Sequence, residues 1–410
     1  MRGAAVGAAV LLVALGVLVA VAVPWRWARP SRPARTAARE SLPSDEVARG
    51  RRLHRELRPS RYVRLAVELA VALVLGLTPV GGDLVAAVGD ALGTGRLVTA
   101  LVGGLVVGAL TQVVGLPVTA WRRTILRRYG LLTQGFAGWL ADLARGAALG
   151  LVLGGGVLTG FFALTGAWPG GWWLPLAGAG ALLSVLLSLV FPVLVEPLFN
   201  RFTPMPASPL RDELLALAAA DGVPVRAVLV ADASRRTRAV NAYVSGFGPT
   251  RRIVVFDTLL SAAPDDEVRL VVAHELGHAR YRDVVLGTAL GAVGAALAAC
   301  ALYLLGGWHG LLALSGARDF ADPRSIGLLY ALATVGQLVS MPAGNLVSRR
   351  IEARADAHAL AVTGEVDTFV AMQGRLALRN LADVAPPTVE HVLFDSHPST
   401  VERIAGASAT

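Results

Sequence analysis

Long apolar runs divide this 410-residue chain and limit what it can fold into. A mean hydropathy of +0.58 and a charged fraction of only 16% do not fit one soluble domain of this length. A helix needs about 20 apolar residues to cross a bilayer. Seven runs reach or approach that length, at Gly3–Val23, Leu65–Val80, Leu97–Leu116, Gly146–Leu164, Leu174–Val195, Val284–Leu305 and Ile326–Met341. We therefore predict a mainly α membrane protein, a bundle of seven transmembrane helices with a small α+β cap.

Basic residues are distributed unevenly over the loops between these runs. The chain has 38 of them, all arginine, and nearly all fall on the side of the membrane that holds residues 207–283. The exceptions are Arg2, Arg96, Arg318 and Arg324. Arginine-rich short loops mark the cytoplasmic face, so a multi-pass protein with a cytoplasmic cap is expected. The lysine-free, Arg/Ala/Gly-rich composition favours a bacterial cell membrane. Ala20–Ala22 also resembles a signal-peptide cleavage site, which would instead place the first loop outside.

The net charge of +9 indicates an anionic partner. The arginines are spread over several loops and are not interleaved with aromatic side chains, as they would be in a nucleic-acid site. Anionic lipid headgroups explain them more simply. Membrane lipids are therefore expected partners, and nucleic acid is not.

A metal-binding motif lies just before the sixth apolar run. In His274-Glu275-Leu276-Gly277-His278 the two histidines are four residues apart, so on a helix they share one face and can bind one metal ion. Glu275 then lies beside the metal, where a general base is needed. In random order the composition gives such a match roughly 0.004 times. The motif predicts one Zn²⁺ per chain and metal-assisted hydrolysis of peptide substrates.

Catalytic zinc takes three protein ligands, and Glu352 is the candidate for the third. Asn345, Arg349, Glu352 and Asp356 follow one another at intervals that place them on one helical face. Asp356 lies one turn after Glu352 and can accept a hydrogen bond from the outer N–H of a ligand histidine. A solvated helix with charge pairs four residues apart shows the same pattern. Asp283, just after the motif, is either another such partner or a boundary residue.

The segment before the motif is expected to contribute a small sheet. We expect a helix and three short strands, at 210–220, 227–230, 239–245 and 252–256. Asn241, Ala242 and Tyr243 are the candidate edge strand, because a protease can hold an extended substrate by adding it to a sheet edge. An ordinary hairpin strand explains these three residues equally well.

The predicted organisation has five parts. They are the first span and an Arg-rich cytoplasmic connector (1–64), spans two to five (65–206), a catalytic segment with the motif helix (207–283), spans six and seven (284–341), and the third-ligand helix with a C-terminal catalytic segment (342–410). Within the connector, Pro43-Ser44-Asp45-Glu46 indicates a helix start, and the remainder is expected to be mostly solvated.

Together these pieces resemble integral membrane zinc metalloproteases of the CAAX prenyl endopeptidase type, a family that also includes the HtpX heat-shock membrane proteases. The matching segments are 197–204, 241–243, 252–260, 274–278, 345–356, His397-Pro398 and Arg403-Ile404. The resemblance implies a seven-helix bundle around a water-filled chamber. It also implies a site with His274, His278 and Glu352 as ligands, Glu275 as base, and 241–243 as the substrate-binding edge.

Near the C-terminus the resemblance implies that His397 stabilises the oxyanion formed during peptide hydrolysis. It also implies that Arg403 orients His397. Ser399 follows His397-Pro398, whereas the prenyl proteases favour a second proline, so the reaction is predicted more firmly than the substrate. We expect a membrane-embedded zinc endopeptidase with a cytoplasm-facing site. One alternative is an HtpX-like quality-control protease. The other is a non-catalytic receptor or transporter with a relic metal site, although such a relic would have lost a ligand.

Overall fold

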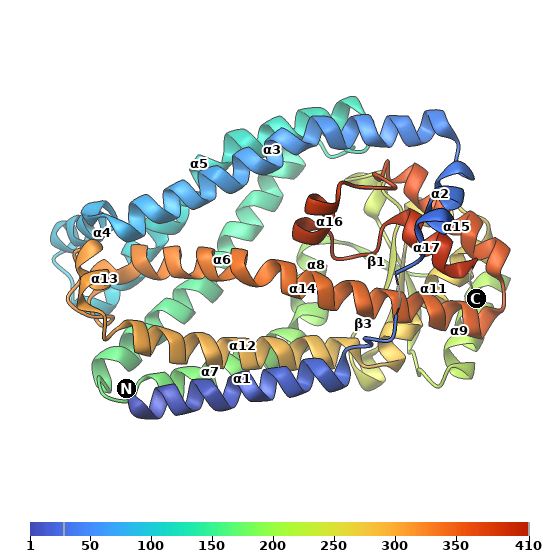
Figure 1. Cartoon of the computed structure of the whole chain (residues 1–410). Helices are drawn as coiled ribbons and strands as arrows, with labels where there is room; N and C mark the ends of the chain where they lie inside the picture. Colours follow the sequence, from blue (N-terminus) through green and yellow to red (C-terminus); the bar gives the residue numbers. More distant parts are fainter. Residues whose placement is uncertain (28, 409–410) are drawn as a thin grey trace.

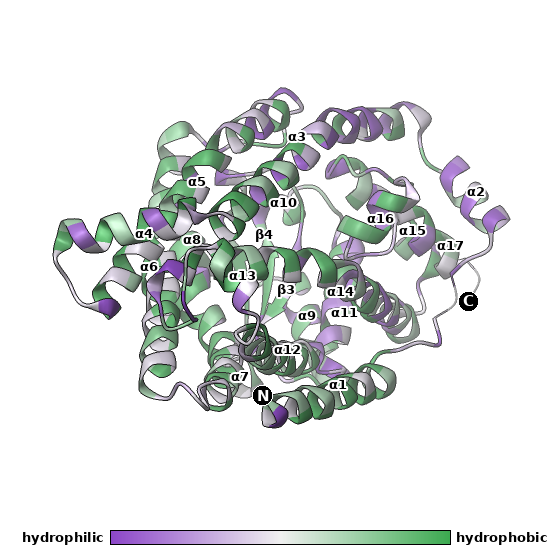
Figure 2. Ribbon diagram, turned by 60° about the vertical axis from the view of Figure 1, so that its left-hand side comes forward, coloured by the Kyte–Doolittle hydropathy of each residue, from purple (hydrophilic) through white to green (hydrophobic). Residues whose placement is uncertain are grey.

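The computed structural model describes residues 1–27 and 29–408 as a long helical bundle with a small sheet at one end (Figure 1). The bundle helices are α1 (Arg2–Ala22), α3 (Ser44–Leu77), α4 (Pro79–Leu92), α5 (Arg96–Arg128), α6 (Phe136–Ala167), α7 (Trp173–Val190), α12 (Asp283–Leu305) and α14 (Ile326–Thr363). Hydrophobic residues cover bundle helices such as α1 and α12, whereas hydrophilic residues gather on the half of α3 nearer the sheet (Figure 2).

Six helices in the described part of the chain are long and apolar enough to cross a membrane, and they carry every expected run except the second. The second run lies on α3 and α4, which bend by 68° and pass the same test only as a pair. The bend occurs at Thr78, in extended conformation just before Pro79. A proline disfavours helical geometry in the residue that precedes it, which explains the break. The structure thus has six such helices, or seven if the bent pair is one span.

The helix α14 links the bundle to the end that holds the sheet (Figure 1). Its 38 residues contain the seventh apolar run and continue without interruption through Glu352 and Asp356, despite Pro342 in the interior. Polar residues after Met341 end the apolar run but do not end the helix. One rigid element therefore carries both a membrane segment and the candidate third ligand.

A four-stranded sheet lies beside the motif helix. Its strands are β1 (Phe202–Pro204), β2 (Ala227–Ala231), β3 (Ala242–Ser245) and β4 (Arg252–Phe256). The spatial order is β1-β2-β4-β3, with β2 and β4 parallel and the other two pairs antiparallel. Among the described strands, β3 pairs only with β4 and is an edge of the sheet. The sequence did not indicate β1, because three residues are too few to show strand periodicity.

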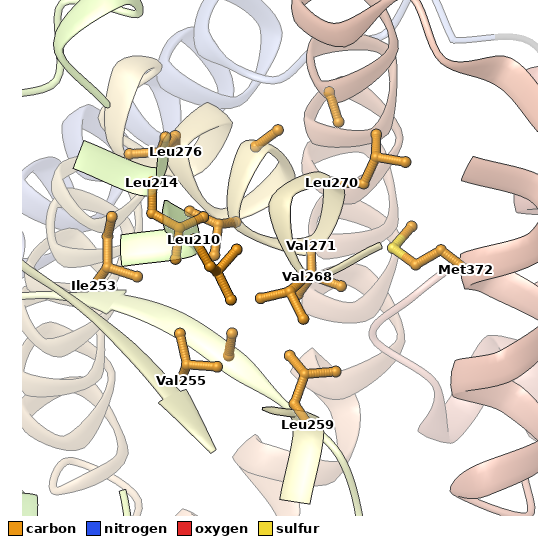
Figure 3. Close-up of a cluster of buried hydrophobic side chains, with 14 of the residues drawn as sticks. Leu210, Leu214, Ile253, Val255, Leu259, Val268, Leu270, Val271, Leu276 and Met372 are labelled. Atoms are coloured by element: carbon orange, nitrogen blue, oxygen red, sulfur yellow. The ribbon is translucent and has the colours of Figure 1, made fainter. Parts of the chain in front are cut away.

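Six helices lie at the same end of the molecule, and all of them except α16 contribute residues to the core beside the sheet. They are α9 (Pro209–Ala220), α10 (Asp257–Leu260), α11 (Asp265–Arg280), α15 (Val366–Arg379), α16 (Thr388–Phe394) and α17 (Thr400–Ala407). Figure 3 shows the buried cluster, in which Leu214, Ile253 and Leu276 come from α9, β4 and α11. Each such side chain contributes about 1.5–3 kcal/mol when fully buried. This core fixes the motif helix against the sheet.

The remaining elements are short. They are α2 (Arg32–Glu40), η1 (Phe191–Val195, a π-helix), α8 (Glu196–Phe199), the 3₁₀ turns η2 (Ala233–Arg235), η3 (Gly248–Thr250) and η4 (Pro323–Ser325), and α13 (His309–Leu314). The π-helix continues α7 toward the sheet and contains Pro192.

The connector after the first span is helical and packs against the C-terminal segment. The helix start predicted at Pro43–Glu46 is confirmed, since α3 begins at Ser44. Although many of its arginines are exposed, Ala38, Val47 and Leu53 are buried in clusters shared with residues 377–405. Apolar residues at helical spacing among the arginines produce this contact, which composition alone does not reveal.

Candidate active site

The motif occupies the C-terminal half of α11. The helix begins after Pro264, and Asp265, Asp266 and Glu267 form its first turn, where carboxylates favour the positive end of the helix dipole. Farther along, the side chains of His274 and His278 meet on one face, with their Nε2 atoms 3.2 Å apart. His274 is only 6% exposed. The four-residue spacing therefore brings two imidazole nitrogens to one point.

The helix α14 brings Glu352 to the same point. Its Oε2 lies 3.2 Å from His274 Nε2, and its Oε1 lies 3.6 Å from His278 Nε2. Glu352 Oε2 is buried, and within the described residues it has no hydrogen-bond partner besides its 3.2 Å charge contact with His274 Nε2. A buried carboxylate oxygen is costly to leave without a partner. The two oxygens of this carboxylate face the Nε2 atoms of His274 and His278, an arrangement that fits a cation held by three ligands of the types zinc uses.

Asp356 lies where an outer partner of His274 is expected. Its Oδ1 is 2.9 Å from His274 Nδ1, and its Oδ2 accepts a 2.8 Å hydrogen bond from Arg403 Nε. Burial opposes the charged form of His274, but the carboxylates of Asp356 and Glu352 outweigh burial and raise its pKa to about 10. The surroundings therefore favour positive charge at this ring, which a proton or a metal ion can supply.

Glu275 lies next to the ligand pair. One of its carboxylate oxygens forms a group with one ring nitrogen each of His274 and His278, and these three atoms lie within 4.8 Å of one another. Burial raises the pKa of Glu275 above its ordinary value, although the two histidines oppose that rise. A more basic carboxylate is better suited to accept a proton from water near neutral pH.

Two residues from the C-terminal segment complete the cluster. His397, in the loop between α16 and α17, places its Nε2 3.3 Å from Glu352 Oε1. Its Nδ1 is 2.9 Å from Ser396 Oγ. Arg403 comes from α17 and forms two contacts with Asp356. The structure thus brings together, from three separate segments, all seven residues expected in the metal and catalytic sets.

The expected substrate strand lies at the same end of the molecule. A cavity of about 450 Å³ is lined by Asn241, His397 and Arg403 among other residues. Ala242 and Tyr243 belong to the edge strand β3, which contacts α11. Ala242 is buried, and the Tyr243 hydroxyl is 3.5 Å from Glu196 Oε2. Of the three, only Asn241 lines the cavity.

The sequence left the role of one partner of these residues open and missed two others. Asp283 Oδ2 lies 2.9 Å from His278 Nδ1, so the boundary residue is also a partner of a ligand histidine. Arg354 donates to Asp283, and Glu196 binds Ser245 Oγ. The five-residue distance from His278 to Asp283 was visible in the sequence, but no pattern singled out Arg354.

This chain is similar to known proteins over most of its length. Residues 204–410 match the model of peptidase family M48, and residues 37–201 match the CAAX prenyl protease N-terminal model with five membrane helices. The chain is 29% identical over 316 residues to the uncharacterized metalloprotease YhfN of Bacillus subtilis, covering 74% of this chain and 71% of that protein. It is 30% identical over 305 residues to a CAAX prenyl protease 1 homolog of Arabidopsis thaliana, covering 72% and 70%. The crystal structure of S. mikatae Ste24p has the same fold, with a TM-score of 0.76 at 20% identity over 99% of both chains.

Proposed function

The chain belongs to peptidase family M48, as a membrane metalloprotease of the CAAX prenyl protease type, and from this premise we propose that it is a zinc-dependent endopeptidase acting at the cytoplasmic face. One observation carries the proposal: His274, His278 and Glu352 converge from two helices around one point. The arginine-rich loops support the cytoplasmic orientation, because positive charge is retained on that side of a bilayer.

The proposed ligands of Zn²⁺ are His274, His278 and Glu352. Zinc held there would supply Lewis-acid activation of the scissile carbonyl and of water. The orphaned Glu352 oxygen supports this assignment, since a cation satisfies it. Two imidazoles and one carboxylate are a ligand set that catalytic zinc uses in proteins, and they would hold the ion here.

The chain's own residues move the protons. Glu275 accepts the proton of the attacking water and passes it to the leaving amine, a role that its raised pKa supports. His397 donates a hydrogen bond to the carbonyl oxygen as negative charge develops there. Arg403 acts indirectly, because it holds Asp356, and Asp356 in turn orients the His274 ring.

The proposed substrate is an extended peptide or protein segment. The edge position of β3 and the neighbouring cavity support strand addition, with Asn241 at the point where strand and cavity meet. Backbone pairing gives no selectivity for side chains, so the sequence preference would come from the residues that line the cavity.

The test compares wild-type protein with Glu275→Gln after purification in detergent. We expect one zinc per chain in both, because Glu275 is not a ligand, and casein-type proteolysis only in the wild type, with a loss of about 10²–10⁴-fold in the variant. His274→Ala is the matched control that should lose zinc as well. Cleavage by Glu275→Gln at a rate comparable to wild type would remove Glu275 from the mechanism. Absence of zinc from the wild type would refute the proposed function.

A further inference from the structure

Each of the two ligand histidines contacts a carboxylate through Nδ1, the ring nitrogen that points away from the candidate metal position. The Nδ1 atom of His274 lies 2.9 Å from Asp356, and the Nδ1 atom of His278 lies 2.9 Å from Asp283. Because the Nε2 atoms face each other and Glu352, a metal ion bound at Nε2 would leave the proton of each ring on Nδ1, where it can be donated to these carboxylates. Such hydrogen bonds fix the orientation and tautomer of a metal-binding imidazole.

Each carboxylate is in turn held by an arginine. Arg403 donates to Asp356, and Arg354, on α14, donates from Nη2 to Asp283. The side chains of Asp283 and Arg354 are 9% and 21% exposed. A pair this buried is screened little by salt and leaves an uncompensated charge when one partner is removed.

The backbone adopts an uncommon conformation to place Asp283. Arg282 has φ 58° and ψ 39°, in the left-handed region, although it is not glycine. This conformation costs about 1–2 kcal/mol for a residue with a side chain. It separates α11 from α12, so that Asp283 begins the new helix while its carboxylate meets His278. Strained residues persist where surrounding contacts determine them.

Arg354 is fixed on its other side as well. Its guanidinium lies 4.5 Å from the centre of the Tyr281 ring, a cation–π distance. Tyr281 packs edge-on against His358, whose Nε2 is 3.0 Å from Asp221 Oδ2. The arginine is therefore held between a carboxylate and an aromatic ring.

We propose that Asp283 and Arg354 are positioning residues for the zinc ligand His278, a proposal that rests on the proposed function. Asp283 is the first residue of α12, and Arg354 lies two residues after Glu352 on α14. Two helices that are long and apolar enough to span the membrane thus jointly set the geometry of the metal site.

The experiment measures zinc dissociation into a chelator from purified full-length protein. We expect Asp283→Asn and Arg354→Gln each to speed dissociation by about 10- to 100-fold, the range found when partners of ligand histidines are changed. Arg350→Gln is the matched control. Arg350 is on the same helix but contacts Trp25 and Trp27 instead of Asp283, so its variant should keep the wild-type rate.

Three further measurements separate positioning from a general loss of stability. Thermal unfolding of the zinc-free variants should change far less than the dissociation rate. The double variant Asp283→Asn/Arg354→Gln should lose less than the two single effects combined, because either change already breaks the pair. Arg282→Gly keeps the pair while relieving the left-handed strain, so it should hold zinc like the wild type.

If Arg354→Gln fails to fold, Arg354→Lys takes its place. Lysine keeps the positive charge but lacks the planar guanidinium group with its several N–H donors. We therefore expect a zinc dissociation rate between those of the wild type and Asp283→Asn. If Asp283→Asn and the Arg354 variant both release zinc at the wild-type rate, Asp283 and Arg354 do not position His278. The proposed function would be unaffected by that result. A wild-type protein that holds no zinc would overturn both.

Discussion

Gly277 lies between the two ligand histidines at a position where any side chain would be crowded. A Cβ there would lie 3.0 Å from Cδ2 of His358 and 3.3 Å from its Cβ. The His358 ring is buried and bound to Asp221, so it has little freedom to move away. The helices α11 and α14 therefore approach closely at this residue, and that approach brings Glu352 within reach of the motif.

We expect Gly277→Ala to lower stability by about 1–3 kcal/mol through overpacking, and to accelerate zinc loss by displacing α14 from α11. Thermal unfolding and zinc dissociation in detergent would measure both effects. Gly287→Ala on α12 is the control, since a Cβ there meets nothing within 4 Å. Alanine in open helical positions is neutral or stabilising by up to about 1 kcal/mol. A Gly277→Ala protein as stable as this control would contradict the close approach.

Individual residues differ in how far the sequence predicts them. The motif residues and Glu352 were identifiable because ligands on a helix must repeat at helical spacing, which a single sequence displays. The contact between Arg354 and Asp283 was not identifiable from the sequence, because these residues are 71 positions apart and the chain has 38 basic side chains. Only the fold selects one arginine from so many.

At the scale of elements, α3 and α14 are in direct backbone contact through two glycines. A Cβ on Gly327 would lie 2.0 Å from the carbonyl oxygen of Leu75, and one on Gly76 would lie 2.4 Å from Cβ of Ala331. Small residues let membrane helices approach in this way, and dispersion and weak hydrogen bonds then hold them. The contact fixes the membrane half of the helix that carries Glu352.

Gly327→Ala should therefore destabilise the bundle by more than Gly277→Ala does, because the obstacle is backbone and cannot rotate away. We expect the free energy of unfolding to fall by at least about 3 kcal/mol, which would appear as a lower midpoint of thermal unfolding in detergent. Gly336→Ala lies on the same helix with nothing within 4 Å of its Cβ, and should melt like the wild type. If Gly327→Ala and Gly336→Ala unfold at the same temperature, α3 and α14 can move apart without loss of stability, which would contradict this prediction.

Elements were predictable wherever hydropathy marks them. Six helices that are long and apolar enough to cross a membrane follow from run length, and the second run coincides with the bent pair at Thr78. Hydropathy does not locate the end of α14, because the helix continues to Thr363 after leaving the apolar environment. The departure at Ser399 also has a local explanation. Its side chain caps α17 in a reciprocal box with Glu402, which a proline cannot form.

At the scale of the whole molecule, segments from both ends of the chain meet in one charged cluster. Arg29, just after the first span, pairs with Glu402 of α17. His391 of α16 places its Nε2 3.2 Å from Glu402 and its Nδ1 3.2 Å from Asp395. Since Arg403 follows Glu402, the cluster ties the N-terminal segment to a helix of the candidate active site.

This cluster gives a pH dependence with a definite sign. Hydrogen bonds to Asp395 and Glu402 raise the pKa of His391 to about 9. Burial opposes ionisation of Glu402, but its hydrogen bonds with His391 and Ser399 lower its pKa to about 2. The His391 contribution is therefore complete below its ordinary pKa of about 6.5 and is lost as pH rises through 9. The Glu402 contribution is complete above about 4.5 and is lost as pH falls toward 2.

We expect His391→Gln to be less stable than the wild type at pH 6, by on the order of 3 kcal/mol for a shift of this size, because the variant has no cation between the two carboxylates. By pH 9.5 most of that difference should have disappeared, since wild-type His391 is then largely neutral. Thermal unfolding of both proteins across this range measures the difference. Groups that do not contact His391 titrate alike in the two proteins and therefore cancel, and Glu402, whose pKa is about 2 beside His391, stays ionised in the wild type throughout this range. A stability difference that stays constant from pH 6 to pH 9.5 would mean that His391 contributes packing and not charge.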